Sequence, residues 1–305
     1  MKLRKVFLPF LCFFASVFAE ELEFLAADGS GFNTKNVPQL IVTEYIKGQG
    51  KLIDNGSIKK QWAAYGRSEE VWQTAEFTII CGTLGVWFYD QENTRKIFFE
   101  PKNRPLKIHA CQPIEGGKLL VAVNKVILEL SPEGKIRKMI RVPYLKDGQR
   151  SQMKSVRKLN DGGYILSDCG HNKIYILDQA GMLTRTINLN KMDLPTKLKK
   201  IHGVELLENG NVLVSTGYGS SLLEINSQDE VVWSLEPDDL PSVGIKYLGG
   251  FSVLDNGNII VAAYNSAFPM FEVSRDKKLI WKLKRDKENG IDLPTSLNQV
   301  SVNSP

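Results

Sequence analysis

The stretch "LLENGNVLVSTG" (206–217) decides the fold, because "VLDNGNIIVAAY" repeats its pattern 47 residues later, at 253–264. Two earlier stretches share the pattern: "PIEGGKLLVAV" (113–123) and "LNDGGYILSDC" (159–169). The second residue of the turn is Gly117, Gly163, Gly210 and Gly257 in the four copies, so successive copies are 46, 47 and 47 residues apart. A period in the forties indicates a supersecondary unit that recurs along the chain.

Each copy contains the same succession of short β-strands. The strand after the turn is followed by a second one ("VILEL", "KIYILD", "SLLEIN", "PMFEVS") and, after a polar turn, by a third ("IRKMIRV", "LTRTINL", "VVWSL", "LIWKL"). Asn-Gly and Asp-Gly favour type I′ hairpin turns, and apolar residues that alternate around them favour strands. Together with the strand before the turn, each copy predicts a four-stranded antiparallel propeller blade, with strands named A to D.

The two ends of the chain complete the repeat. "EFTIICGTLGVWFYDQENTRKIFF" (76–99) aligns with the later copies without a glycine turn, and "QLIVTEYIKGQGKLIDNGSIKKQW" (39–62) supplies only strands B to D. The terminal "SLNQVSVNSP" (296–305) reads as the missing strand A. Pairing of residues near 296–302 with residues near 39–44 would close the ring and remove exposed sheet edges. The prediction is an all-β, six-bladed β-propeller over 37–305, with four antiparallel strands per blade and almost no helix.

The N-terminus indicates export. Three basic residues, Lys2, Arg4 and Lys5, precede the apolar run "VFLPFLCFFASVF", and a small residue ends a V-x-A site at Ala19. This pattern predicts a signal peptide at 1–19, an extension at 20–36 and a secreted or periplasmic protein. A membrane anchor is the alternative, although the run is short for a bilayer span and contains proline. We expect no membrane span in the mature chain.

Charge and cysteine content limit the partners and the covalent structure. Without residues 1–19 the chain keeps 36 basic and 34 acidic residues, a net charge of +2, which gives no basis for a nucleic-acid partner. Cys81, Cys111 and Cys169 remain after Cys12 is removed, so at least one lies outside an intramolecular disulfide. Cys81 and Cys111 are possible neighbours, and we first expect both to be buried apolar fillers.

Two blades carry a family resemblance. "LSDCGHNKIYILD" resembles the strand–turn–strand of NHL repeats, and "GNVLVSTGYGSSLLEINSQDEVVWSL" and "GNIIVAAYNSAFPMFEVSRDKKLIWKL" resemble secreted bacterial quinoprotein-like (PQQ-binding-like) propellers. The resemblance implies fold more than function, since one fold hosts many chemistries. It places Trp62, Trp233 and Trp281 in packing positions of strand D, and no cofactor is identified.

The start of strand A lies at the mouth of a propeller's central channel. Counting from the turns places Glu69, His109, Ser155, His202, Gly249 and Ser296 at this position. Two of the three histidines thus share one repeat position, near a carboxylate and two hydroxyls. Neutral imidazole is a frequent metal ligand and titrates near neutral pH. The hypothesis is an ion, anion or acid–base site, and the alternative is a hydrogen-bonding residue of the repeat; no metal ligand set is assigned.

Loops on the same face supply further candidates. The B–C loops carry Asp168, His171, Tyr218, Tyr264 and Asn265, which suit a small polar ligand but also suit ordinary turns. The long D–A connections hold cations that would favour an anionic ligand or form a solvated rim, namely Lys146, Arg150, Lys197, Lys199 and Lys200.

Known catalytic motifs are absent. The chain has no G-x-S-x-G, no H-E-x-x-H, no G-x-x-x-x-G-K-[ST] and no C-x-x-C. The leading hypothesis is therefore a monomeric, secreted propeller that binds a small molecule, a glycan or a protein through its funnelled face. The alternative is a propeller hydrolase, lyase or transferase that uses the channel-mouth histidines, with or without a divalent metal.

Overall fold

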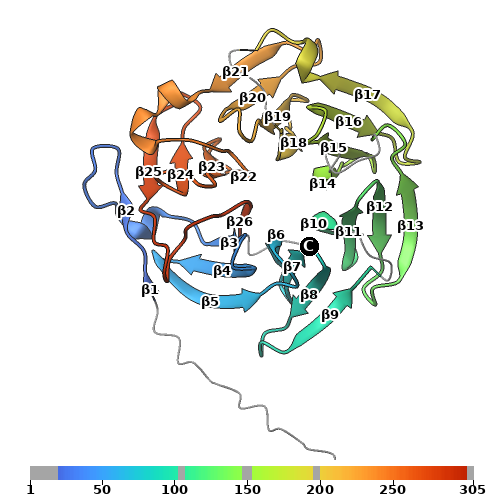
Figure 1. The fold of residues 1–305 in the computed structure, drawn as a ribbon, viewed down its shortest axis with the longest axis horizontal. Coiled ribbons are helices and arrows are strands. Elements are labelled where there is room, and N and C mark those ends of the chain that lie inside the picture. Colours follow the sequence, from blue (N-terminus) through green and yellow to red (C-terminus); the bar gives the residue numbers. More distant parts are fainter. Residues whose placement is uncertain (1–19, 102–106, 146–152, 195–199, 301–305) are drawn as a thin grey trace, which may run out of the picture.

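The chain folds into six β-sheets arranged around a central axis (Figure 1). The computed structural model describes residues 20–101, 107–145, 153–194 and 200–300. Each sheet holds four antiparallel strands in the order A-B-C-D, and two sheets carry one additional strand at their outer edge. The predicted six-bladed β-propeller is confirmed. The only helices in the described residues are the 3-10 turns η1 (Thr34–Asn36), η2 (Leu189–Lys191), η3 (Pro237–Asp239) and η4 (Pro241–Val243).

The blades are numbered along the chain. Blade 1 is β6 (Ser68–Gln73), β7 (Thr78–Gly82), β8 (Gly85–Tyr89) and β9 (Arg95–Phe99). Blade 2 is β10 (Ile108–Ile114), β11 (Lys118–Val123), β12 (Val126–Leu130) and β13 (Ile136–Arg141). Blade 3 is β14 (Met153–Lys158), β15 (Tyr164–Asp168), β16 (Lys173–Leu177) and β17 (Leu183–Asn188).

The remaining blades complete the ring. Blade 4 is β18 (Val204–Leu206), β19 (Val212–Ser215), β20 (Leu222–Ile225) and β21 (Val231–Leu235). Blade 5 is β22 (Phe251–Val253), β23 (Ile259–Ala262), β24 (Met270–Val273) and β25 (Leu279–Leu283). Blade 6 combines β26 (Leu297–Gln299) with β3 (Leu40–Glu44), β4 (Gln49–Asp54) and β5 (Ser57–Ala63).

Blade 6 closes the ring as expected. In β26, Leu297 pairs with Val42, and the register continues to Gln299 and Leu40. The hydroxyl of Thr43 adds a side-chain clamp, because it accepts hydrogen bonds from the backbone N–H groups of Thr295 (3.1 Å) and Ser296 (2.9 Å). Strands from the two ends of the chain therefore share one sheet, and residues 301–305 of the expected strand lie outside the described part.

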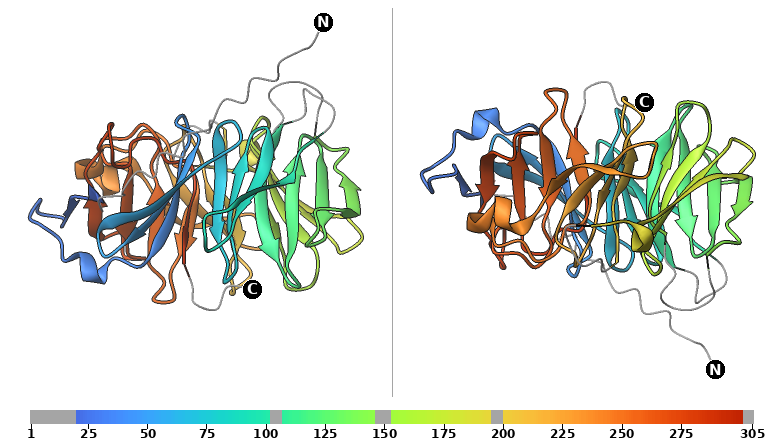
Figure 2. Two further views of the ribbon diagram at one scale, coloured as in Figure 1. Left: turned by 90° about the horizontal axis from the view of Figure 1, so that it is seen from below. Right: turned by 90° about the horizontal axis from the view of Figure 1, so that it is seen from above.

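The N-terminal segment binds the outside of the seam. The short strand β1 (Glu20–Glu21) pairs with β5 of blade 6, and β2 (Phe24–Leu25) pairs with β25 of blade 5. Phe24 packs edge-on against Trp281, with ring centroids 5.1 Å apart. Figure 2 shows this segment at the rim of the disc, beside the orange and red blades. It covers the strand D edges of two neighbouring blades.

The repeated Asn-Gly-Asn sequence has a specific function in blades 4 and 5. The Asn209 carboxamide oxygen accepts the N–H of Asn211 (3.0 Å), and the side-chain NH₂ of Asn211 reaches Glu224 of strand C (2.6 Å). Asn256 and Asn258 make the equivalent bonds, the latter to Glu272 at 2.6 Å. The Asn-Gly-Asn sequence recurs because, in each A–B turn, its second asparagine donates a hydrogen bond to the glutamate of strand C.

The turn type in blades 4 and 5 differs from the expectation, whereas in blade 2 both Gly116 (φ 74°) and Gly117 (φ 66°) are left-handed. Gly210 (φ 83°) and Gly257 (φ 82°) are left-handed, whereas Asn209 and Asn256 are not. A type I′ turn needs positive φ at both central residues. The Gly210 N–H donates to Leu207 and the Leu207 N–H donates to Asn211, so the loop is a type I turn followed by one left-handed glycine. In blade 3 the left-handed glycine of the turn is Gly162 (φ 84°), not Gly163.

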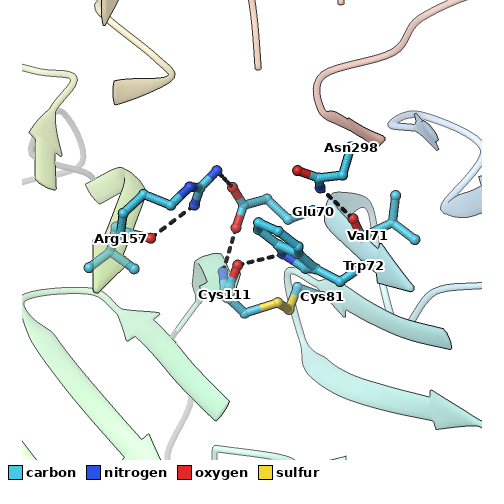
Figure 3. The surroundings of a disulfide bond; sticks show 8 residues. Glu70, Val71, Trp72, Cys81, Cys111, Arg157 and Asn298 are labelled. Carbon is cyan, nitrogen blue, oxygen red and sulfur yellow. Dashed lines mark hydrogen bonds and ion pairs between the residues drawn. A yellow bond between two sulfur atoms is a disulfide. The ribbon is translucent and has the colours of Figure 1, made fainter. Parts of the chain in front are cut away.

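A disulfide joins Cys81 of β7 to Cys111 of β10, with the Cα atoms 6.3 Å apart. The two cysteines are neighbours and fully buried, as considered from the sequence, but the first expectation that both serve only as apolar fillers was wrong. Strand B of blade 1 and strand A of blade 2 converge beside the channel, which brings the two side chains together (Figure 3). Cys169 stays free and buried.

The left-handed turn glycine predicts a backbone-specific cost. Gly210→Val should lower the free energy of unfolding by about 1–3 kcal/mol, because a β-branched residue is strained at positive φ. An added Cβ meets no atom within 4 Å there, so steric clash does not contribute. The control is Gly31→Val, which also has open space but no positive φ. Urea unfolding that gives equal stability for the two variants would contradict the assignment.

The disulfide predicts a redox-dependent stability. Replacing both Cys81 and Cys111 by alanine should lower the free energy of unfolding by about 2–4 kcal/mol, because the bond restricts a loop in the unfolded chain. The bond spans a separation of 30 residues. With a thiol reductant in the urea series, the parent should lose most of its advantage over the double variant. Cys169→Ala should keep the redox dependence, and a parent that is indifferent to the reductant would count against the bond.

Candidate functional site

A β-bulge opens strand A at the channel mouth of the first four blades. The pairing of β6 with β7 skips Glu69, that of β10 with β11 skips His109, and that of β14 with β15 skips Lys154. Just before β18, the N–H of His202 donates to the carbonyl of Ser215 (2.8 Å), and the N–H of Ser215 donates to the carbonyl of Gly203. Two residues of this segment therefore face one residue of β19, as in a bulge. A bulge re-aims its extra side chain. These four side chains, the mouth cluster, therefore occupy one repeat position.

The register in blade 3 differs by one residue from the prediction. Lys154, not Ser155, is equivalent to His109 and His202. The prediction took Gly163 as the reference residue of the turn, whereas the left-handed glycine is Gly162. Ser155 is buried deeper in the channel, with its hydroxyl 3.5 Å from the carbonyl of Val204.

The closing blade shifts in the same way. The N–H of Thr43 donates to Ser296, as the N–H of Ala262 does to Gly250 in blade 5. The residue equivalent to Gly249 is therefore Thr295, one position before the predicted Ser296.

Glu69 is the electrostatic centre of the mouth cluster. Its side chain is 2% exposed, and its carboxylate lies 3.0 Å from the ammonium of Lys154 and 3.7 Å from Nδ1 of His109. Burial favours a raised pKa for Glu69, but the Lys154 charge and the His109 ring outweigh it and hold the pKa at about 2. Conversely, attraction to Glu69 overcomes burial and raises the pKa of Lys154. A charged pair spans from blade 1 to blade 3.

Both mouth histidines are neutral at physiological pH. Burial, followed by the nearby Lys154 charge, lowers the pKa of His202 to about 3. Burial also lowers the pKa of His109, against the opposing pull of Glu69. Among the residues that the structure describes, neither Nδ1 atom finds a hydrogen-bond partner, and both atoms are buried. Unpaired buried polar atoms cost stability, and strongly shifted groups in a cleft mark candidate functional sites.

Four tyrosines form a continuous aromatic row that contacts this cluster through Tyr247. Edge-to-face contacts link Tyr45 to Tyr264 (ring centroids 6.1 Å apart), Tyr264 to Tyr247 (5.6 Å) and Tyr247 to Tyr218 (4.7 Å). Tyr247 also meets the His202 ring edge-on at 5.9 Å. The four residues are called the tyrosine row. Its outer end, Tyr218, is 54% exposed, so the row runs from solvent to a buried imidazole.

Two cations lie against the ends of the tyrosine row. The Arg67 guanidinium is 5.4 Å from the ring centroid of Tyr45, and the Lys200 ammonium is 6.0 Å from that of Tyr218. Burial raises the pKa of the Tyr247 phenol well above its usual value, so this hydroxyl stays protonated. The site therefore presents phenol hydroxyls, ring faces and positive charge around a neutral imidazole.

The predicted loop residues divide into two groups. Tyr218 and Tyr264 belong to the tyrosine row, and Asn265 is a left-handed turn residue (φ 54°) beside it. Asp168 instead accepts the N–H of Gly170 (3.1 Å) and lies 2.9 Å from Nδ1 of His171. This pair organises the B–C turn of blade 3. Among the predicted rim cations, Lys146, Arg150, Lys197 and Lys199 lie outside the described residues.

Sequence reasoning missed Lys154, Tyr45, Tyr247 and Arg67. The one-residue error in blade 3 put Ser155 in the place of Lys154. Lys154 lies eight positions before Gly162, just as His202 lies eight positions before Gly210. Tyr45 follows strand B of blade 6 where Tyr264 follows strand B of blade 5, so an alignment of the two would have found it. Tyr247 lies in an irregular D–A connection, and no repeat signal marks it.

The channel narrows directly below the mouth. Arg157 of blade 3 reaches across to Glu70 of blade 1 (2.9 Å), and the Glu70 carboxylate also accepts the N–H of Cys111 (2.6 Å; Figure 3). The cavity between the mouth cluster and this pair is about 10 Å³, the size of one water molecule. Within the described ranges no group of three or more His, Cys, Asp or Glu side chains is placed to hold a metal ion. In those same ranges, no helix is long and apolar enough to cross a bilayer.

Comparison with known proteins supports the fold. No family model and no curated protein matches the chain. Among solved structures, a Bacteroides caccae protein of unknown function superposes with a TM-score of 0.69 at 16% identity, over 86% of this chain and 98% of that one.

Two lyases are also similar in structure. A streptogramin B lyase gives a TM-score of 0.62 at 12% identity, over 86% of this chain and 84% of that one. A catalytically inactive histidine-to-alanine variant of virginiamycin B lyase from Staphylococcus aureus, with quinupristin, gives 0.55 at 11% identity, over 87% and 100%. At these identities the likeness shows the shared β-propeller fold alone.

The buried neutral His202 predicts a specific acid sensitivity. Its pKa is about 3 in the folded chain against an ordinary 6.5, so its stabilising effect is complete above pH 6.5 and is lost as the pH falls towards 3. Between pH 6 and 5, His202→Gln should lose up to about 1.4 kcal/mol per pH unit less stability than the parent. Urea unfolding at several pH values measures this slope. The control Ser155→Ala should keep the parent's slope, and equal slopes for His202→Gln and the parent would contradict the assignment.

Proposed function

We propose that this protein binds a small molecule or glycan against the tyrosine row and the mouth cluster, which together form the surface called the bowl below. The observation that carries the proposal is the unbroken contact from the exposed Tyr218, through Tyr247, to the buried neutral imidazole of His202. Small-ligand sites typically combine aromatic walls with a few convergent polar groups. The tyrosine rings supply the walls, and the mouth cluster supplies the polar floor.

The charges of the bowl define the ligand further. Arg67 and Lys200 lie at opposite ends of the tyrosine row, while the negative charge of Glu69 is already matched by Lys154. A ligand with a flat ring face and hydroxyl or anionic substituents would therefore find stacking surfaces, donors and unmatched positive charge. A cationic ligand would gain less, because the carboxylate nearest the mouth is engaged.

A second candidate function is acid–base catalysis at the same place. Nδ1 of His109 lies 3.7 Å from the Glu69 carboxylate, which is longer than a hydrogen bond. A carboxylate can orient an imidazole base, and catalytic contacts of this kind often shorten only when substrate binds. Two structural neighbours are lyases, and a histidine-to-alanine variant of one is described as catalytically inactive. This supports testing His109 for catalysis and makes no statement about the same substrate.

Export is part of the proposal. We infer that residues 1–19 are a signal peptide and that the chain works outside the cytoplasm as a propeller of the NHL or quinoprotein-like type. The disulfide between Cys81 and Cys111 supports this inference, because such bonds persist in oxidising compartments.

The binding proposal is tested by a thermal-shift screen with mono- and disaccharides, nucleosides and aromatic carboxylic acids. A compound that binds the folded state raises the melting temperature. We expect at least one such compound, and we expect Tyr218→Ala to weaken its binding at least tenfold while changing the free energy of unfolding by no more than about 0.5 kcal/mol. Calorimetric titration measures both affinities.

The control is Tyr144→Ala, a comparably exposed tyrosine (38%) that packs against Tyr175 away from the tyrosine row. It should leave the affinity unchanged. Equal affinity in the parent and in Tyr218→Ala would contradict binding in the bowl. If the compound is also converted, loss of turnover in His109→Ala with retained binding would establish the second candidate instead.

A further inference from the structure

Three of the six junctions between neighbouring blades share one side-chain bridge. A long side chain of strand D crosses to a backbone carbonyl in the C–D turn of the next blade. The donors are Lys138 to Gln179, Arg185 to Asn226 (2.7 Å) and Trp233 to Arg275 (2.8 Å). The bridge recurs between blades 2 and 3, 3 and 4, and 4 and 5, on the face opposite the tyrosine row.

The bridge is missing between blades 1 and 2. Lys96 holds the equivalent position, because it pairs with Phe88 of strand C as Lys138 pairs with Glu129. Lys96 is exposed, and its ammonium makes no hydrogen bond or ion pair with any residue that the structure describes. In place of the bridge there is a pocket of about 400 Å³, which Lys96 and Pro132 both line.

The floor of this pocket includes an apolar side chain at a strand C position that is a glutamate in three of the six blades. Strand C carries a glutamate at this position in blades 2, 4 and 5: Glu129, Glu224 and Glu272. Each engages a neighbour, for example Glu129 with Lys158 (2.7 Å). In blade 1 the residue is Phe88, whose ring stacks on Phe98 at 4.0 Å with an interplanar angle of 4°.

The pocket places the Lys96 side chain beside aromatic rings as well as charged groups. Phe77, Phe88 and Phe98 line the pocket, and Lys96 and Lys118 stand among its lining residues with the acids Glu76 and Asp90. The Asp90 carboxylate is engaged by the N–H of Thr94 (2.7 Å) and closes the C–D turn. The pocket thus offers an aromatic floor, two lysines and two acids, of which Asp90 is already bonded.

We propose that the pocket between blades 1 and 2 binds a small amphipathic carboxylate. Its apolar body would lie on the phenylalanine floor, and its carboxylate would pair with the Lys96 ammonium and so replace the missing strand C glutamate. The volume falls within the range of small-ligand sites, and burial of apolar area supplies the main driving force. The site lies on the opposite face from the tyrosine row and is independent of the function proposed there.

The test uses decanoate and the uncharged decan-1-ol as probes, each titrated calorimetrically into the full chain below its solubility limit. We expect both to bind. Lys96→Met should weaken decanoate about fivefold, as for an exposed ion pair, and leave decan-1-ol unchanged. Thr94→Trp, which places a ring at the pocket wall, should abolish both. Lys59→Met, an exposed strand D lysine of blade 6, is the matched control and should bind both probes like the parent.

Three results would overturn the proposal. One is no binding of decanoate, and another is equal decanoate affinity in the parent and in Thr94→Trp. The third is loss of decanoate binding in Tyr218→Ala, which would place the probe in the bowl. A thermal unfolding curve of each variant verifies that it is folded before titration.

Discussion

The pairing of β26 with β3 is the constraint on which the rest of the structure depends. It joins Leu297 to Val42 across more than 250 residues of chain and converts an open row of sheets into a ring. Thr43 and Glu44 reinforce the seam, since Thr43 accepts two N–H groups from the strand A side and Glu44 accepts the N–H of Asp292 (2.9 Å). Because the strands A meet only in a closed ring, the mouth cluster exists only when this seam is formed.

The mouth cluster shows how a propeller stabilises charge near its axis. Glu69 and Lys154 are both largely buried, which is costly for either alone, and their attraction across the channel keeps both ionised. Burial is the main cause of the lowered pKa that keeps His202 neutral, and the Lys154 charge adds to it. Burial and one ion pair therefore set the protonation of the neighbouring imidazoles, and the result is a site with neutral bases and fixed charges.

Blade 1, which lines the pocket proposed as a binding site, differs in sequence from blades 4 and 5. Blades 4 and 5 keep the strand C glutamates Glu224 and Glu272, which satisfy their A–B turns. Blade 1 has neither the glycine turn nor the glutamate, and the disulfide through Cys81 ties it to blade 2 instead. Blades 1 and 2 are thus linked covalently near the axis. At the rim, the described residues form no strand D bridge between these two blades, and the pocket lined by Lys96 lies there instead.

The sequence by itself determined the architecture. The 47-residue step from Gly210 to Gly257 and the unpaired strand near residue 296 were sufficient for six blades and for closure, because hairpin turns and strand alternation are local properties. The mouth position of Glu69, His109 and His202 also followed, since equivalent repeat positions lie at equivalent places around the axis.

Only the tertiary structure decided which side chains meet. Lys154 replaced Ser155 because the backbone conformation, and not the letters "GG", shows which glycine of a pair is left-handed. The Cys81–Cys111 bond and the tyrosine row join residues of different blades, and their partners are fixed by the angle and spacing between sheets. Periodicity specifies each blade separately, whereas contacts between blades depend on how the sheets pack around the axis, and no local pattern encodes that.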